Sequence, residues 1–289
     1  MRGFIVVNSF QVIPPIQYCI DRIIYEFRKS DLEIEIKTTF DILVEIRENR
    51  FGKYDFALFY DKETEVCSLL ESKGVRVFNP SKSIEECDDK YTTYKVLKAH
   101  KIPQPDTMLS PLNYSNLLND AILYKIKEYF GFPLVIKEVH GSLGKKVYLV
   151  NNMKEFAEKE QEIVNSKHIF QKFIKSSKGV DYRVLILGHK VVGCIKRESP
   201  KDFRSNLSTG GQASQVELPK EFTALAIKVS KILNLDYCGV DLLVDEDGSP
   251  LVCEVNSNAF FRGFEQATNI NVARKIVDYI IEVISNENK

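Results

Sequence analysis

The N-terminal part of the chain alternates short apolar runs with amphipathic ones. Strands are predicted at 3–7, 32–38, 54–60 and 75–80, and helices at 18–27 and 66–74. This repetition predicts a small, mostly parallel sheet covered by helices, with its ligand-binding edge at the carboxyl ends of the strands. Asn8 and Ser9 follow the first strand at such an end, but no G-x-G-x-x-G motif follows them. The pattern therefore predicts an α/β domain that lacks the dinucleotide-binding fingerprint.

The next part of the pattern begins with a helix at 83–102, which Ser83 is expected to cap together with Glu86. Pro103 and Pro105 end this helix. A helix (117–131), two strands joined by a glycine-bearing turn (133–150), a helix (153–164) and a strand (168–174) follow. This order predicts a compact α+β lobe of about seventy residues.

The remainder of the chain is rich in strands. A hairpin at 180–199 turns at Gly188 and His189, and a loop at 202–214 leads to a helix at 222–233. A second hairpin at 237–258 and a closing helix at 271–285 complete the pattern. We therefore expect three domains, at 1–87, 88–174 and 175–289.

Composition narrows the class of protein. Of 289 residues, 44% are hydrophobic and 28% charged, which is typical of a globular protein. Forty basic residues balance forty acidic ones, so no global field favours nucleic acid or an anionic membrane. The apolar runs are too short to span a membrane, and MRGFIVVNSF does not resemble a secretory signal, so we expect a cytoplasmic protein. Six scattered cysteines without a C-x-x-C pair favour reduced core thiols.

The hairpin before the last helix contains the most informative polar residues. The turn at 245–248 brings Asp241 opposite the neighbourhood of Cys253 and Glu254, and Glu254 and Asn256 point the same way. Carboxylates so close together repel one another unless a cation lies between them, and Mg²⁺ prefers oxygen ligands. The alternative is a solvated face with incidental acids. A Mg²⁺ site in turn indicates a bound nucleotide, because this ion takes phosphate oxygens as ligands.

The glycine turn HGSLGKK is a second candidate. Its Gly141 and Gly144, flanked by Ser142 and Lys145, could place backbone amides over phosphate oxygens. The spacing is not that of a Walker A loop, and an ordinary hairpin turn is the alternative. Lys137 lies in the preceding apolar strand, where a lysine must extend to solvent or meet an anion such as a polyphosphate.

The segment DFRSNLSTGG is a third candidate. Arg204 and Asn206 alternate on one side of an extended segment that precedes Gly210 and Gly211. This layout could present a guanidinium group and an amide to phosphate or carboxylate oxygens. An ordinary polar loop is the alternative.

Taken in order and spacing, the motifs resemble those of the ATP-grasp ligases of the RimK and LysX type. They are DDK (88–90), VIK (135–137), the glycine turn, HIFQKFI, GVDYRVLILG, DFRSNLSTGG, GVDLLV and CEVN. The resemblance covers residues 88 to 285. It implies an ATP-grasp fold, of mixed α/β and α+β class, preceded by a small parallel-sheet domain, the pre-ATP-grasp domain.

The resemblance also implies roles for individual residues. Lys90 and Lys137 would hold the ATP phosphates together with Ser142 of the glycine turn. The backbone of Lys172 and Phe173 would contact adenine, and Asp181 the ribose. Arg204 and Asn206 would act catalytically beside the γ-phosphate. Asp241, Glu254 and Asn256 would bind Mg²⁺, or Mn²⁺ in its place.

The activity implied by the resemblance is ATP-dependent joining of a carboxylate to an amine. The carboxylate, from a small molecule, a peptide or a protein terminus, would become an acyl phosphate, and an amino acid amine would attack it, releasing ADP and phosphate. In the segment SNAFFRG, Arg262 and Asn258 could bind a substrate carboxylate, although Arg262 could equally be a surface charge. The alternative function is a catalytically silent ATP-binding sensor or partner module. Related ligases assemble as homodimers or homotetramers, and we expect neither nucleic acid nor membrane as a partner.

Overall fold

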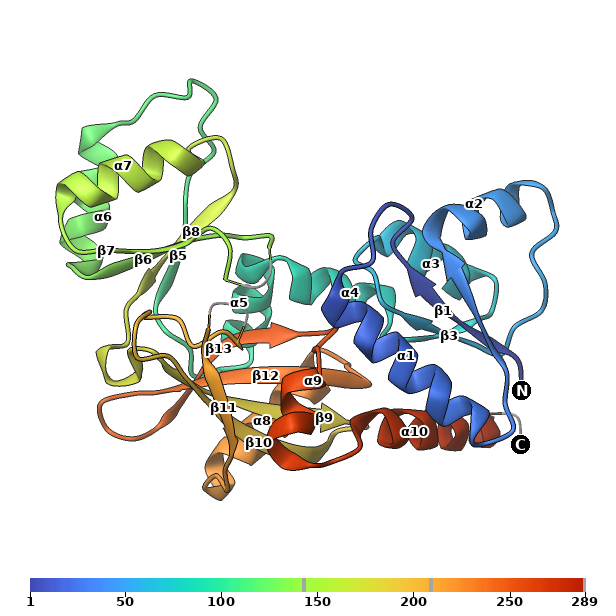
Figure 1. The fold of residues 1–289 in the computed structure, drawn as a ribbon. Coiled ribbons are helices and arrows are strands. Elements are labelled where there is room, and N and C mark those ends of the chain that lie inside the picture. Colours follow the sequence, from blue (N-terminus) through green and yellow to red (C-terminus); the bar gives the residue numbers. More distant parts are fainter. Residues whose placement is uncertain (142–143, 208–209, 288–289) are drawn as a thin grey trace.

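The computed structural model describes residues 1–141, 144–207 and 210–287. Their strands form three sheets, with the small lobe of residues 107–172 at the upper left of Figure 1 and the N-terminal sheet at the right. The largest sheet lies below and between them. Within the described ranges, no helix combines the length and the apolar character needed to cross a membrane.

The N-terminal sheet is parallel throughout, as predicted. It has the order β2-β1-β3-β4 and consists of β1 (Gly3–Val7), β2 (Ile34–Thr38), β3 (Phe56–Phe59) and β4 (Arg76–Phe78). Helices α1 (Pro14–Arg28) and α3 (Thr64–Ser72) lie at the predicted places. Helix α2 (Thr39–Arg47) was not predicted, although Thr38 and Asp41 form a capping box at its start.

The single helix predicted at 83–102 is wrong. The chain forms two helices, α4 (Ser81–Asp88) and α5 (Lys90–Ala99), separated at Asp89. The Asp89 side chain caps α5 by accepting a hydrogen bond from the Thr92 amide (2.8 Å). The capping role expected of Ser83 is also wrong, because Ser83 lies inside α4 and its hydroxyl donates to the carbonyl of Asn234.

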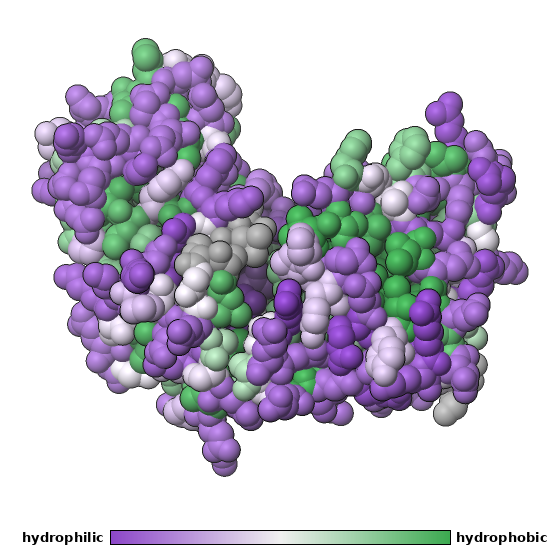
Figure 2. Space-filling model, in the orientation of Figure 1, coloured by the Kyte–Doolittle hydropathy of each residue, from purple (hydrophilic) through white to green (hydrophobic). Residues whose placement is uncertain are grey.

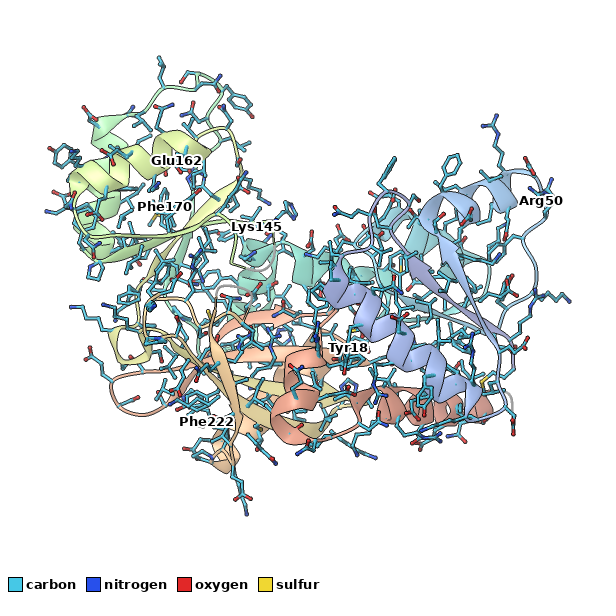
Figure 3. All side chains as sticks on the ribbon, in the orientation of Figure 1. Tyr18, Arg50, Lys145, Glu162, Phe170 and Phe222 are labelled. Carbon is cyan, nitrogen blue, oxygen red and sulfur yellow. The ribbon has the colours of Figure 1, made fainter. Side chains whose placement is uncertain are left out.

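The small lobe is an antiparallel sheet with two helices on it. The strands β5 (Thr107–Leu109), β6 (Leu134–Glu138), β7 (Val147–Val150) and β8 (His168–Lys172) have the order β5-β8-β6-β7. Helices α6 (Asp120–Phe130) and α7 (Met153–Ile163) bury Phe156 and Phe170 against the sheet (Figure 3). Each such fully buried side chain contributes about 1.5–3 kcal/mol of hydrophobic stabilisation. Strand β5 was not predicted, since three residues carry too little periodicity to be recognised.

The large sheet contains both predicted hairpins. Its order is β11-β10-β9-β12-β13, with β9 (Val180–Leu187), β10 (Lys190–Glu198), β11 (Gln212–Gln215), β12 (Tyr237–Val244) and β13 (Pro250–Asn256). Helix α8 (Lys220–Ile232) packs on one face, and α9 (Arg262–Thr268) and α10 (Val272–Glu287) pack with α1 on the other. A 3-10 turn, η1 (Lys175–Ser177), joins the small lobe to this sheet.

The N-terminal sheet is fixed to the large sheet by a shared core and by buried polar contacts. Helix α1 packs against α10, and the core cluster includes side chains from both parts. The Asn79 amide donates to the carbonyls of Tyr237 (2.8 Å) and Ser257 (2.7 Å), and Arg76 pairs with Asp236 (2.6 Å). These two parts therefore form one continuous unit, while the small lobe stands above them (Figure 1).

Candidate functional site

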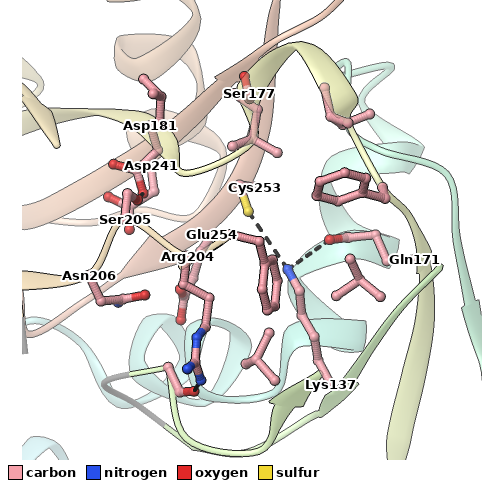
Figure 4. Close-up of a pocket in the computed structure, with 18 of the residues that line it drawn as sticks. Lys137, Gln171, Ser177, Asp181, Arg204, Ser205, Asn206, Asp241, Cys253 and Glu254 are labelled. Atoms are coloured by element: carbon pink, nitrogen blue, oxygen red, sulfur yellow. Dashed lines mark hydrogen bonds between the residues drawn. The ribbon is translucent and has the colours of Figure 1, made fainter. Parts of the chain in front are cut away.

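A cavity of about 850 Å³ lies between the small lobe and the large sheet. We call it the interlobe cavity; Figure 4 shows its charged side chains converging from both walls. Most of the residues named from the sequence line it: Lys90, Lys137, Lys172, Phe173, Asp181, Arg204, Asn206, Asp241 and Glu254. Its cations come from both lobes, so an anionic ligand would be held between them.

Two lysines reach this cavity from different elements. Lys137 lies on β6, and its ammonium donates to Oε1 of Gln171 (2.7 Å) and approaches the sulfur of Cys253 (3.7 Å) (Figure 4). Lys90 begins α5, and its ammonium donates to the carbonyl of Gly141 (3.0 Å). Burial lowers the pKa of Lys90, and the carboxylate of Glu254 opposes this shift. Both ammonium groups donate to neutral acceptors here, so neither of these hydrogen bonds pairs the lysine with a carboxylate.

The glycine turn meets the loop of Arg204. The guanidinium of Arg204 donates to the carbonyl of Gly144 (2.6 Å) and to the carboxylate of Asp202 (2.7 Å). Gly144 has a φ of +70°, and a Cβ atom there would lie 3.1 Å from Oδ1 of Asn206. Glycine is therefore suited to this position by both conformation and space. Ser142 lies outside the described residues.

The predicted carboxylate pair forms across the last hairpin. Asp241 on β12 pairs directly with Glu254 on β13, and Gly239 pairs with Asn256. The amide of Asn256 donates to Oδ2 of Asp241 (3.3 Å). A bulge follows Asp241, while Val240 and Leu242 are fully buried on the other face of the sheet. The hairpin thus gathers the three oxygen-bearing side chains on one face.

Two arginines that were not singled out from the sequence neutralise this face. Arg183 contacts both carboxylate oxygens of Asp241 (2.7 Å each), and Arg197 bridges Asp241 (2.8 Å) and Asp181 (2.5 Å). Burial alone would raise the pKa of Asp241, but the two guanidinium groups outweigh it and the pKa is lowered. For Asp181, burial dominates and raises the pKa despite Arg197. Both arginines lie in apolar strands, the same signal that identified Lys137.

These side chains suit a hard cation that is shared with phosphate. Asp241 and Glu254 carry carboxylate oxygens and Asn256 an amide oxygen, the ligand types that Mg²⁺ prefers. Asp241 would have to exchange a contact with Arg183 or Arg197 for the ion. Among the described residues, no group of three or more His, Cys, Asp or Glu side chains could hold a metal ion. The two carboxylates of Asp241 and Glu254 would supply only part of the coordination of such a cation. Waters and phosphate oxygens would supply the rest, as is usual for Mg²⁺.

The link after β8 borders the other end of the interlobe cavity. The amide N–H of Lys172 donates to the carbonyl of Asp106 (2.9 Å), so this group is already used within the small lobe. Phe173 contacts the ring of Phe203 across the cavity (6.3 Å between centroids). A flat apolar ligand would find aromatic surface here.

A second cavity, of about 1890 Å³, adjoins the first. The two share Lys90, Gly141, Arg197, Asn206 and Glu254 in their walls. Of these two cavities, Asn256, Asn258 and Arg262 line the second and not the first. We call the second the lower cavity. Arg262 is exposed and lies over the ring of Tyr18 (5.5 Å), and the amide of Asn258 donates to the carbonyl of Asp61 (3.1 Å). Figure 2 shows the hollow between the small lobe and the N-terminal part.

Comparison with known proteins gives consistent matches over most of the chain. The model of the RimK-like ATP-grasp domain matches residues 87–280. Human N-acetylaspartylglutamate synthase A is 36% identical over 230 residues, which cover 78% of this chain but only 57% of that protein. Human beta-citrylglutamate synthase B is 37% identical, with 78% of this chain and 58% of that protein covered. The glutamate–LysW ligase ArgX of Sulfurisphaera tokodaii is 32% identical over 264 residues, covering 86% and 91%.

Solved structures share the fold over the whole chain. The D-alanine–D-alanine ligase of Bacillus anthracis, complexed with ATP, has a TM-score of 0.76 and 25% identity, with 99% of each chain covered. The ATP-grasp ligase PsnB, complexed with a minimal precursor, has a TM-score of 0.74 at 17% identity, with 98% of this chain and 99% of that one covered. The mixed α/β architecture expected from the sequence is therefore confirmed as the ATP-grasp fold.

Proposed function

Because this chain belongs to the RimK-like ATP-grasp family, we propose that it is an ATP-dependent carboxylate–amine ligase. The observation that supports this most directly is the composition of the lining of the interlobe cavity. Lys90, Lys137 and Arg204 line it together with Asp241 and Glu254. Cations for a triphosphate and oxygen ligands for its counter-ion thus lie together, which phosphoryl transfer requires.

ATP would lie in the interlobe cavity with its phosphates toward the two lysines. Lys90 and Lys137 would exchange their present acceptors for phosphate oxygens, and the glycine turn with Ser142 would cover them. Asp181 would contact the ribose, and the backbone of Lys172 and Phe173 the adenine. Mg²⁺, or Mn²⁺, held by Asp241, Glu254 and Asn256, would neutralise phosphate charge.

The reaction would proceed in two steps. The substrate carboxylate attacks the γ-phosphorus of ATP, forming an acyl phosphate and releasing ADP. A deprotonated amine then attacks the acyl carbon, phosphate leaves, and an amide bond forms. Arg204 would stabilise the charge that develops on the transferred phosphoryl group and on the tetrahedral oxyanion, with Asn206 beside it. No cysteine or serine nucleophile is needed.

The substrates would meet in the lower cavity, which adjoins the phosphate end of the first. Its Arg262 and Asn258 would bind a substrate carboxylate. The names of three relatives include glutamate, so L-glutamate is the first amine to test. The carboxylate that is activated as acyl phosphate would come from a small molecule, a peptide or a protein terminus.

The test measures ADP release from the purified protein with ATP, Mg²⁺, L-glutamate and pools of carboxylic acids. We expect release to depend on an added acid, and hydroxylamine to trap the acyl phosphate as a hydroxamate. The variant Glu254→Gln should abolish both signals. Nucleotide binding without substrate-stimulated ADP release would instead identify a silent ATP-binding module.

A further inference from the structure

The strand order of the N-terminal sheet marks a place where ligands bind in parallel sheets. From β1 the sheet extends to β2 on one side and to β3 and β4 on the other, so the order reverses between β1 and β3. In open α/β sheets, ligands bind outside the carboxyl ends of the strands at such a switch point. Asn8 follows β1 there, and Tyr60 and Asp61 follow β3.

This switch point opens into the lower cavity. Asn8, Tyr60, Asp61 and Lys62 line the same cavity as Asn258 and Arg262 of the C-terminal part. The family model begins only at residue 87, so this wall lies outside the matched domain. A ligand in the lower cavity would therefore contact residues that the ATP-grasp domain does not contain.

Asp61 lines this wall and has one unsatisfied carboxylate oxygen. Its Oδ1 accepts hydrogen bonds from the amides of Lys62 (2.6 Å) and Glu63 (3.2 Å), which fix the carboxyl group. Its Oδ2 is shielded from solvent and has no hydrogen-bond partner in the described part of the chain. A buried carboxylate oxygen without a donor is costly, so such an atom marks a place where a donor is missing.

The neighbouring ammonium group of Lys62 does not donate to Oδ2 of Asp61. The ammonium group of Lys62 pairs with Asp88 at the end of α4. Arg262, exposed on the C-terminal side of the cavity, lies over the ring of Tyr18. The cavity therefore offers an anionic acceptor on one wall and a cationic guanidinium on another, an arrangement complementary to a zwitterion.

We propose that Asp61, at the switch point of the N-terminal sheet, recognises the α-ammonium group of an amino acid substrate whose carboxylate faces Arg262. This inference rests on the proposed ligase function, since it names the group that selects the amine substrate. Before attack, the amine must lose a proton; Asp61 is assigned only the binding and orientation of the amino group.

The variant Asp61→Asn tests the proposal with little change in shape. The amide oxygen of asparagine can still accept from Lys62 and Glu63, while its NH₂ group replaces Oδ2 with a donor. The matched control is Glu63→Gln, which removes the same charge from an exposed side chain outside the cavity lining. Isothermal titration calorimetry would measure binding of each standard amino acid, L-glutamate first, in the presence of Mg²⁺ and a non-hydrolysable ATP analogue.

We expect at least one amino acid to bind wild type and Glu63→Gln equally, and Asp61→Asn at least about tenfold more weakly, as for a lost hydrogen bond to a charged group. The N-acetyl derivative of that amino acid should bind none of the three proteins well. Affinity for the ATP analogue should be unchanged. Equal binding to wild type and Asp61→Asn, or no binding of any amino acid to wild type, would overturn the role of Asp61.

These outcomes separate the inference from the ligase proposal. If ADP release is stimulated by substrates in both wild type and Asp61→Asn with the same KM for the amine, the ligase function stands and the role of Asp61 is refuted. If amino acids bind through Asp61 without any stimulated ADP release, the recognition site stands and the ligase function fails.

Discussion

Substitution of Arg197 tests how much charge compensation in the lining of the interlobe cavity contributes to the stability of the fold. The Arg197 side chain is 5% exposed and bridges the carboxylates of Asp181 and Asp241. In Arg197→Met, Asp241 keeps its paired contacts with Arg183, whereas Asp181 keeps the hydroxyl of Ser205 (2.5 Å). The substitution therefore leaves Asp181, whose side chain is 13% exposed, as a largely buried charge without its counter-ion.

Loss of one partner from a buried ion pair costs about 3–5 kcal/mol of folding free energy. We expect a decrease of this size for Arg197→Met at neutral pH, measured by urea unfolding followed by circular dichroism. The control Arg50→Met removes an exposed arginine paired with Glu48 and should change stability by less than about 0.5 kcal/mol.

The cause can be checked with a second substitution and with pH. In Arg197→Met/Asp181→Asn the unpaired charge is gone, so the double variant should be more stable than Arg197→Met alone. The pKa of Asp181 is already raised by burial and should rise further without Arg197, so the native state binds a proton more tightly than the unfolded state. The penalty should therefore shrink as pH falls through that raised value. A loss under about 1 kcal/mol, or a loss independent of Asp181 and pH, would show that Arg197 does not stabilise the fold by compensating the charge of Asp181.

Three further predictions concern other parts of the molecule. Arg204→Ala should lower kcat for ADP release about 10²–10³-fold with ATP affinity retained; near-normal turnover would exclude its transition-state role. Gly144→Ala should raise the KM for ATP because its Cβ would press on Asn206, whereas Gly248→Ala, also at positive φ but with open space around it, should destabilise similarly without changing KM. Burial lowers the pKa of His168, but the hydrogen bond to Glu160 (3.0 Å) outweighs this and the net pKa is raised. The stabilisation by His168 is complete below its unfolded pKa near 6.5 and is lost as the pH rises through its folded pKa. In urea unfolding, the free energy of unfolding of Glu160→Gln should therefore decline less between pH 6 and 9 than that of wild type.

Local patterns were sufficient wherever the structure depends on neighbours in sequence. The alternating runs of the N-terminal part predict its parallel sheet, and the turn at 245–248 predicts the pairing of Asp241 with Glu254. The register of a hairpin follows from its turn residues and from the need to bury one face of the strands, so it can be predicted from a single sequence. The division into three domains and the roles of the individual site residues remain predictions.

The sequence-based predictions were wrong at positions where contacts between residues far apart in the chain determine the local structure. The helix expected at 83–102 is interrupted because the Lys90 amide bonds to the carbonyl of Val139 in the small lobe (3.0 Å) and Asp89 caps a new helix. Ser83 has the sequence of a cap but is buried against Asn234. Val139 and Asn234 are far away in sequence, so no local pattern could have revealed these two contacts, whereas the Asp89 cap is a local contact with Thr92.

Most of the elements, the hairpin that aligns two carboxylates, and the family could be predicted from the sequence, because these depend on periodicity, turn residues and motif spacing. The tertiary structure alone decided which charges meet. It placed Arg183 and Arg197 on Asp241, and it brought Asp61 of the N-terminal sheet to the wall of the cavity that Arg262 also lines. Arg183, Arg197 and Asp241 come from three strands of the large sheet, and Asp61 and Arg262 come from opposite ends of the chain. The energies of such contacts depend on burial and distance in space rather than on separation along the chain.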